Sequence, residues 1–272
     1  MKLATCNEYF EGWKIEEVFE YAAQVGYQGV EIAPFALAPS VAEIGGERRR
    51  QIRQAASQAG VEIVGLHWLL VSPPGLYVDH PDSAIRRATQ DYFKALIRFC
   101  GELGGEVMIL GSPKQRSVQP GWDYGETWQR ARETFEACLP LAQECGVYLC
   151  LEPLSPEQTN FVTTAEEARR MVAQIGHPHF RTMVDVCSGS TEARPVAQLL
   201  RDSGPHLFHV HVNDANKRGP GFGQTDFVPI LRALKELDYR RYVSLEVFDF
   251  TPDPRTIAAR SLGYLQGILA AL

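Results

Sequence analysis

Eight short apolar runs alternate along the chain with segments of helical periodicity, and this alternation restricts the fold more than any other feature. Parallel strands need a long crossover, usually a helix, so alternating strands and helices are typical of a parallel sheet. We therefore predict an α/β protein. In chain order, the runs expected to form strands are residues 2–6, 29–33, 61–67, 107–110, 147–152, 181–185, 207–212 and 242–247.

The segments between these runs carry apolar residues at helical spacing, as residues 13–25 and 227–237 illustrate. Several of these segments end at a glycine just before the next predicted strand, where glycine provides the left-handed cap that ends a helix. The pattern therefore predicts a helix in each crossover. The capping glycines are Gly26, Gly60, Gly104, Gly105 and Gly146.

Eight strand–helix units in 272 residues favour a closed (β/α)8 TIM barrel that forms a single domain over residues 1–272. An open doubly wound sheet would show a similar alternation. A dinucleotide-binding sheet, however, should carry G-x-G-x-x-G after its first strand, and none follows Cys6. Two long irregular segments, residues 71–83 and 112–124, follow the third and fourth predicted strands and are candidate walls or lids of a site.

Composition narrows the environment and the partners. The net charge of −6 provides no basic field for a phosphate backbone, so we expect no nucleic-acid partner. Six scattered cysteines without a C-x-x-C pair indicate reduced, mostly core thiols. We expect a soluble, cytoplasmic protein without a membrane partner, because no leader or long apolar run is visible. Apolar residues within segment 69–77 are compatible with a homo-oligomer.

Polar residues at the carboxyl ends of the last four predicted strands carry the strongest functional signal. Each follows a run too apolar to be a solvated face, and barrel enzymes place their chemistry at this rim. Strand side chains alternate between interior and exterior, so all four residues can point inward and converge. They are Glu152, Asp185, His211 and Glu246.

Three convergent carboxylates would repel one another and lose hydration, so a cation at their centre is the simplest physical resolution. We therefore predict that the four residues bind one divalent metal. Three oxygen ligands and one nitrogen suit Mn²⁺, our first choice, as well as Mg²⁺ or Co²⁺, and Zn²⁺ stays open because of its intrinsic affinity. His209 lies one layer deeper than His211 on the same face and is interpreted as a supporting or core histidine.

Residues 147–250 resemble the xylose isomerase-like barrel superfamily, and within it the ketose 3-epimerases and related sugar isomerases. The resemblance rests on the sequences LEPL, VDV, HVHVNDANKRGPGFG and SLEVF. That group has a metal-binding histidine followed by an acidic residue, Ala-Asn-Arg and a Pro-Gly-x-Gly turn. His211, Asp214, Ala215, Asn216, Pro220, Gly221 and Gly223 occupy those places. The first half matches mainly in its strand–helix rhythm and in Gly-Tyr-x-Gly-Val-Glu at residues 26–31.

The resemblance implies a metal-dependent isomerase or epimerase whose small-molecule substrate is a ketose or another keto-sugar. A metal on the carbonyl and the adjacent hydroxyl would polarise the carbonyl and stabilise an enediolate as the neighbouring proton leaves. Glu152 and Glu246 belong to the fifth and eighth strands, across the metal. One could therefore deprotonate one face of the carbon while the other reprotonates the opposite face. Asp185 and His211 would mainly anchor the ion.

Further contacts with the sugar are expected from the ends of earlier strands. His67 and Trp68 follow the third strand and could hydrogen-bond to the sugar and stack on it, with core packing as the alternative. Glu31 ends the second strand and has the same two interpretations.

The resemblance adds contacts where the chain departs from the group. Ser188 stands where the group usually has a histidine that meets a sugar hydroxyl, and an expected acidic contact is either Glu157 or Gln158. Lys217 replaces a usual arginine. Together with Arg218, Lys217 binds a substrate oxygen or phosphate, or else forms a solvated basic pair.

Three other functions compete with the epimerase. A metal-assisted keto-sugar lyase or dehydratase would begin with the same proton removal and then expel a leaving group. An apurinic-site endonuclease, which shares this superfamily's barrel, needs three zinc ions and more rim histidines than this chain offers. Of its seven histidines, four fall in predicted loops or helix ends. A barrel that binds a sugar without turnover is disfavoured because Glu152 and Glu246 are intact.

Overall fold

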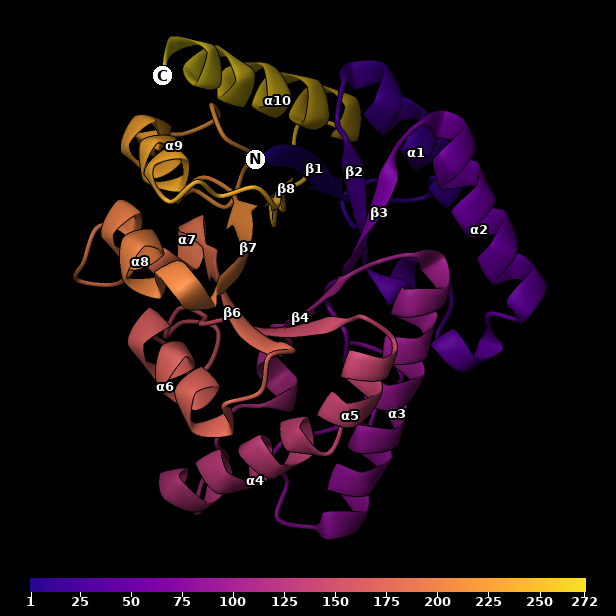
Figure 1. Cartoon of the computed structure of the whole chain (residues 1–272), viewed down its shortest axis with the longest axis vertical. Coiled ribbons are helices and arrows are strands. Elements are labelled where there is room, and N and C mark those ends of the chain that lie inside the picture. The colour runs from indigo at the N-terminus through magenta and orange to yellow at the C-terminus, as the bar shows by residue number, and fades with distance from the viewer.

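The computed structural model describes residues 1–272 and forms a closed barrel of eight parallel strands, which confirms the predicted (β/α)8 TIM barrel. Figure 1 shows the helices arranged around the strands. Each strand pairs with the next one in the chain, and the last pairs with the first. The strands are β1 (Lys2–Cys6), β2 (Gly29–Ile32), β3 (Glu62–Leu66), β4 (Val107–Leu110), β5 (Tyr148–Leu151), β6 (Phe180–Asp185), β7 (Leu207–Val212) and β8 (Tyr242–Leu245).

All eight predicted strands form, but β3, β5 and β8 end before the polar residues that were assigned to them. His67, Glu152 and Glu246 each occupy the first position after their strand. The backbone N–H of each still donates to a carbonyl of the preceding strand, at 3.1, 3.4 and 3.4 Å respectively. Sheet pairing therefore continues far enough to hold these three residues at the carboxyl rim.

Helices fill every crossover, and two crossovers contain more than one α-helix. Gly26 and Gly104 end α1 and α3 with φ of 111° and 87°, as predicted for left-handed caps that residues with a Cβ adopt at a cost. The α-helices are α1 (Ile15–Val25), α2 (Gly46–Ala59), α3 (Ser83–Leu103), α4 (Tyr124–Glu136), α5 (Leu139–Glu144), α6 (Ala165–Ile175), α7 (Val186–Gly189), α8 (Val196–Ser203), α9 (Phe227–Glu236) and α10 (Pro254–Ala271). The 3₁₀ turns are η1 (Pro34–Ala36), η2 (Val41–Glu43), η3 (Pro113–Gln115) and η4 (Gly204–His206).

The barrel interior is divided into an apolar part and a polar part. The main hydrophobic core of 66 buried residues includes the side chains that pack helices onto strands. A separate buried cluster of seven residues, which includes Val64, Val107 and Phe208, lies inside toward the amino ends of the strands. Farther along the strands the interior contains Glu31, His67, His209 and His211, each at most 1% exposed. The buried polar layer therefore lies directly below the rim that was predicted to carry the chemistry.

Two predictions about the whole chain can be compared with the structure. All six cysteines are free and four are buried, as expected for reduced core thiols. No helix has both the length and the apolar character needed to cross a membrane.

Candidate active site and metal centre

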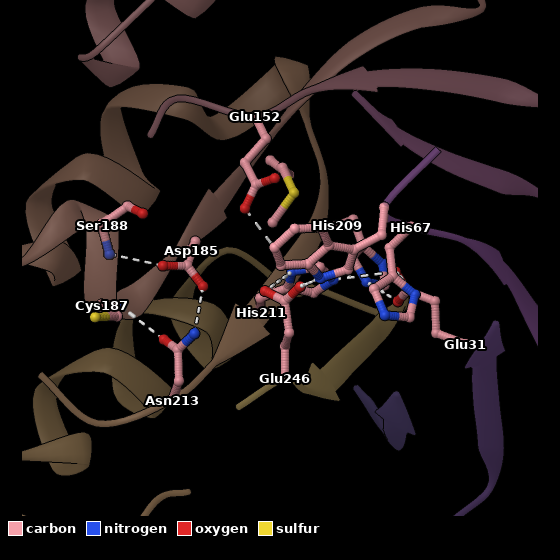
Figure 2. A network of polar contacts seen from close by, with 12 residues as sticks. Glu31, His67, Glu152, Asp185, Cys187, Ser188, His209, His211, Asn213 and Glu246 are labelled. Atoms are coloured by element: carbon pink, nitrogen blue, oxygen red, sulfur yellow. Dashed lines mark hydrogen bonds and ion pairs between the residues drawn. The ribbon is translucent and has the colours of Figure 1, made fainter. Parts of the chain in front are cut away.

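The four residues predicted as metal ligands converge at the carboxyl rim of the barrel. One ligand atom from each of Glu152, Asp185, His211 and Glu246 lies within 4.8 Å of every other, and all four residues are buried. Nδ1 of His211 lies 3.0 Å from Oε2 of Glu246 and 4.0 Å from Oε1 of Glu152. Figure 2 shows the four side chains meeting, with His211 between the acidic residues.

Asp185 is fixed from the side opposite the cluster. The backbone N–H of Ser188 donates to Oδ1 of Asp185 at 2.6 Å, and the side-chain amide of Asn213 donates to Oδ2, also at 2.6 Å. Asn213 is itself held because its Oδ1 accepts the backbone N–H of Cys187 at 2.7 Å. Both oxygens of Asp185 therefore have donors that fix the orientation of the carboxylate (Figure 2).

Burial and mutual charge make the four groups interdependent. Burial raises the pKa of Glu152 well above its ordinary value, and the charge of Glu246 raises it further. Burial and the same charge raise the pKa of Asp185 to about 6. Burial also disfavours the charged form of Glu246, but the charge of His211 outweighs it and lowers the pKa of Glu246. The charge of one imidazole therefore cannot offset the burial and mutual repulsion of all three carboxylates, and the pKa of Glu152 remains well above its ordinary value.

The cluster fits a divalent cation in its geometry and in its chemistry. Nδ1 of His211 and Oε2 of Glu246 are buried, and neither makes a hydrogen bond of good geometry. Buried polar atoms rarely stay unpartnered. Three carboxylates and one imidazole also form an oxygen-rich donor set of the kind that Mn²⁺ and Mg²⁺ accept. The residues present therefore match the predicted metal site.

The backbone after β4 leaves room for Glu152. A Cβ added at Gly111 would lie 2.2 Å from Oε2 of Glu152, so any larger residue would displace the carboxylate. Gly111 was not identified from the sequence.

A pocket opens onto the cluster and is walled by the loops that follow β3, β4, β5 and β8. The candidate wall at residues 112–124 contributes Ser112 and Pro113, whereas residues 71–83 do not reach the pocket. Ten residues line it: His67, Trp68, Gly111, Ser112, Pro113, Glu152, Leu154, Gln158, Glu246 and Phe248.

Trp68 lies in this pocket, with its indole directed at the cluster. Its Nε1–H donates to Oε1 of Glu246 at 2.9 Å. The Trp68 backbone has φ of 52°, a region that residues other than glycine rarely adopt and that is enriched at functional sites. The ring meets Phe248 edge-on, with centroids 6.3 Å apart. Trp68 thus combines an apolar surface with a direct contact to a candidate ligand.

Glu31 lies deeper than was predicted for a sugar contact, whereas His67 is buried but lines the pocket. Glu31 is fully buried and contacts His209 at 2.7 Å and His211 at 3.1 Å. His67 is 1% exposed, and its Nε2 lies 2.8 Å from Oε2 of Glu8. Glu31 does not line the pocket and lies below the cluster.

The charged residues predicted near the substrate lie at the outer edge of the site. Lys217 pairs with Glu157 at 3.7 Å, and both side chains are more than half exposed. Arg218 donates to the carbonyl of Thr251 at 2.7 Å and lies 3.8 Å from Asp249. None of these residues lines the pocket.

Ser188 and Gln158 form a neutral pair next to the cluster. The Ser188 hydroxyl donates to Oε1 of Gln158 at 3.1 Å, and Gln158 lines the pocket. Of the two alternatives for the contact after Glu152, the structure places Gln158 in the pocket wall and Glu157 outside it. Asn213 and Glu8 were missed because no spacing rule connects either of them with its partner.

With this fold and site described, comparison with known proteins defines the class of the chain. Residues 19–268 match the family of xylose isomerase-like TIM barrels, and the chain belongs to that family. The chain is 26% identical to fructoselysine 3-epimerase of Shigella flexneri over 94% of this chain and 93% of that protein. It is 24% identical to 3-dehydro-D-guloside 4-epimerase of Escherichia coli over 98% of this chain and 99% of that protein.

A solved structure is similar over the same extent. The crystal structure of D-psicose 3-epimerase in the presence of D-fructose superposes with a TM-score of 0.86, at 21% identity and over 99% of both chains. This similarity supports the barrel fold across the whole length of the chain.

Proposed function

We propose that this protein is a divalent-metal-dependent sugar epimerase or isomerase that acts on a keto-sugar. The observation that carries the proposal is the buried set of three carboxylates and one imidazole at the carboxyl rim, beside a pocket. The activities named for the full-length relatives support the reaction class. One of these relatives is named a 3-epimerase and the other a 4-epimerase. The carbon that this chain inverts is therefore to be identified by experiment.

The metal would be held by Glu152, Asp185, His211 and Glu246. Once bound, it supplies a Lewis acid that polarises a sugar carbonyl and stabilises negative charge that develops beside it. Mn²⁺ is the proposed ion because the donor set is mostly oxygen, with Mg²⁺, Co²⁺ and Zn²⁺ as the alternatives to be compared.

Glu152 and Glu246 are the proposed proton carriers. They follow β5 and β8, and both line the pocket, so the proposal assigns the space between their carboxylates to the reacting carbon of the sugar. One carboxylate takes the proton beside the carbonyl, and the other delivers a proton to the opposite face of the same carbon. A positioned acid or base contributes a rate factor of about 10² to 10⁴. Asp185, held by two donors, is suited to anchoring rather than to proton transfer.

The substrate is proposed to be an unphosphorylated keto-sugar. No lysine or arginine lines the pocket, and Lys217 and Arg218 are engaged at its outer edge. A phosphate buried in such a pocket would lack the cationic partners that charged groups need when they leave water. The neutral Ser188–Gln158 pair, with Trp68 and Phe248, suits hydroxyl groups and the apolar face of a sugar ring.

Solvent exchange tests the proposal directly. The protein, loaded in turn with each of the four ions, is incubated in D₂O with D-fructose, D-tagatose, D-psicose, fructoselysine, a 3-keto-glucoside and phosphorylated ketoses, and products are followed by NMR. We expect deuterium at the carbon that is inverted, together with the epimer. Loss of a leaving group instead would establish a lyase, and exchange confined to phosphorylated ketoses would overturn the proposed substrate class. If none of these sugars takes up deuterium with any of the four ions, the proposed function is wrong.

A further inference from the structure

Glu31 is a buried carboxylate inside the barrel that contacts three histidines and takes no direct part in the proposed reaction. Its carboxylate is fully buried on β2, and the side chain reaches across the interior to β7. Oε2 lies 2.7 Å from Nε2 of His209, and Oε1 lies 3.1 Å from Nε2 of His211. Oε1 also lies 3.6 Å from Nδ1 of His67. Figure 2 shows Glu31 beside these histidines, on the far side of His211 from Asp185.

The two nitrogens of His211 face different partners. Nδ1 faces the carboxylates of Glu246 and Glu152, whereas Nε2 faces Glu31. A neutral imidazole has one N–H and one lone pair, and the hydrogen bond made by one nitrogen decides which nitrogen carries the proton. A carboxylate at Nε2 retains the proton there, so the lone pair of Nδ1 points into the cluster.

The strand pairing supports a specific placement of this carboxylate. The register between β2 and β3 shifts between Val30 and Glu31. Such irregularities re-aim a side chain and are common beside active sites. Glu8 and His67 extend the network outward, because Nε2 of His67 lies 2.8 Å from Oε2 of Glu8. Glu31 thus lies among three imidazoles, is hydrogen-bonded to His211, and is not a solvated group.

We propose that Glu31 is a positioning residue for the metal centre: it holds the proton of His211 on Nε2, so that Nδ1 is presented as a ligand. The proposal rests on the metal-dependent function proposed above. It replaces the predicted role of Glu31 as a sugar contact, because Glu31 lies below the pocket and lines no part of it.

A second arrangement of the same residues serves as the competing hypothesis. Glu31, His209 and His211 also lie close enough to bind an ion of their own, as do Cys6, Glu31 and His67. If Glu31 were itself a ligand, the protein would bind two ions per chain. We favour the positioning role because Nε2 of His211 and Oε1 of Glu31 form a hydrogen bond at 3.1 Å, which already engages the nitrogen that a second ion would need.

Metal affinity provides the first test, since it does not depend on turnover. Mn²⁺ and Co²⁺ binding are measured by calorimetry on the full chain and on Glu31→Gln, Glu31→Asp, Asp79→Asn and Asp185→Asn. Removal of a carboxylate that orients a ligand histidine typically weakens metal binding about 10- to 100-fold. We expect that loss in Glu31→Gln with one ion still bound, and a smaller loss in Glu31→Asp, which keeps the charge. Asp79→Asn is the matched control, because Asp79 is also a fully buried carboxylate but lies outside the cluster.

The outcomes separate this inference from the proposed function. Unchanged affinity in Glu31→Gln overturns the positioning role while leaving the metal site intact. Two ions bound per wild-type chain overturn it as well, because Glu31 would then be a ligand. Failure of the wild type to bind any ion removes the proposed function itself. Loss of binding in Asp185→Asn, together with weakened binding of a single ion in Glu31→Gln, supports both the metal-dependent function and the positioning role.

Histidine NMR tests the inference without any variant, in case Glu31→Gln does not fold. In chelator-treated wild-type protein labelled with ¹⁵N-histidine, where no ion blocks Nδ1, the neutral ring of His211 is expected to carry its proton on Nε2. A proton on Nδ1 of His211 would contradict the proposal.

Discussion

The indole Nε1–H of Trp68 donates to Oε1 of Glu246 across 2.9 Å, and the other oxygen of Glu246 faces Nδ1 of His211 at 3.0 Å. One side chain from the β3 end thereby decides which carboxylate oxygen of Glu246 is presented to the cluster. The positive φ of Trp68 makes this contact possible, because it turns the residue away from the continuing direction of the strand.

Trp68→Phe removes the donor and keeps an aromatic surface. A hydrogen bond to a charged group contributes about 1.5–3 kcal/mol, so kcat/KM should fall about 10- to 100-fold. The fall should be mainly in kcat, since an aromatic ring is retained in the pocket. Trp128→Phe is the matched control, because its Nε1 donates to Gln174 at a distant helix pair. Equal losses in both variants would mean that only packing is involved.

Substitution of Glu152 and of Glu246 should affect proton exchange and inversion differently. Glu152→Gln and Glu246→Gln each remove one proposed proton carrier and, assayed with the metal ion at saturation because each glutamate is also a proposed ligand, each should lower epimerisation by about 10² to 10⁴. If the two act on opposite faces of one carbon, the variant that lacks the second carrier should still exchange the substrate proton with D₂O while forming little epimer. NMR of recovered substrate and product distinguishes exchange from inversion. Inversion at the wild-type rate in either variant is incompatible with the proposed pair.

The alternation of strands and helices predicts the barrel, because parallel strands need helical crossovers. In such a barrel the carboxyl ends of all strands share one rim. Asp185 and His211 could be placed there from parity along their strands alone. How deep a side chain lies inside the barrel, and which side chain it meets on another strand, could not be predicted in the same way. Glu31 and His211 are separated by 180 residues and meet only because the barrel closes. The contact of Trp68 with Glu246 depends on one unusual backbone conformation, which no periodicity reveals.

The bound ion should stabilise the fold. A ligand that binds only the native state stabilises it by about 2.7 kcal/mol when its concentration is 100 times Kd. Addition of Mn²⁺ to chelator-treated protein should therefore raise the Tm measured by calorimetry. Asp185→Asn should show little or no rise, because the variant loses one of four ligands. A wild-type Tm that is the same with and without each candidate ion would count against the site.

Lys217→Ala and Arg218→Ala should be nearly neutral on unphosphorylated sugars. Their ion pairs with Glu157 and Asp249 are partly exposed and span 3.7 and 3.8 Å. Pairs of this kind contribute about 0–1 kcal/mol. We expect less than about a threefold change in KM, since a larger interaction would require a desolvated contact. A large rise in KM for either variant would place its side chain against the substrate after all.

Asp79 should make stability depend on pH in an unusual direction. Burial raises the pKa of Asp79 to about 8, against 3.8 as its ordinary value, while the charges of Arg130 and Arg116 oppose the rise. Because the folded state holds the proton more tightly, ionisation in the unfolded state destabilises the fold progressively from about pH 4 to about pH 8. Asp79→Asn carries no ionisable group there. Its stability relative to wild type, from urea unfolding at a series of pH values, should therefore increase over this range and level off above it. A difference that is constant from pH 4 to pH 9 would show that Asp79 is ionised throughout, paired with the buried Arg116.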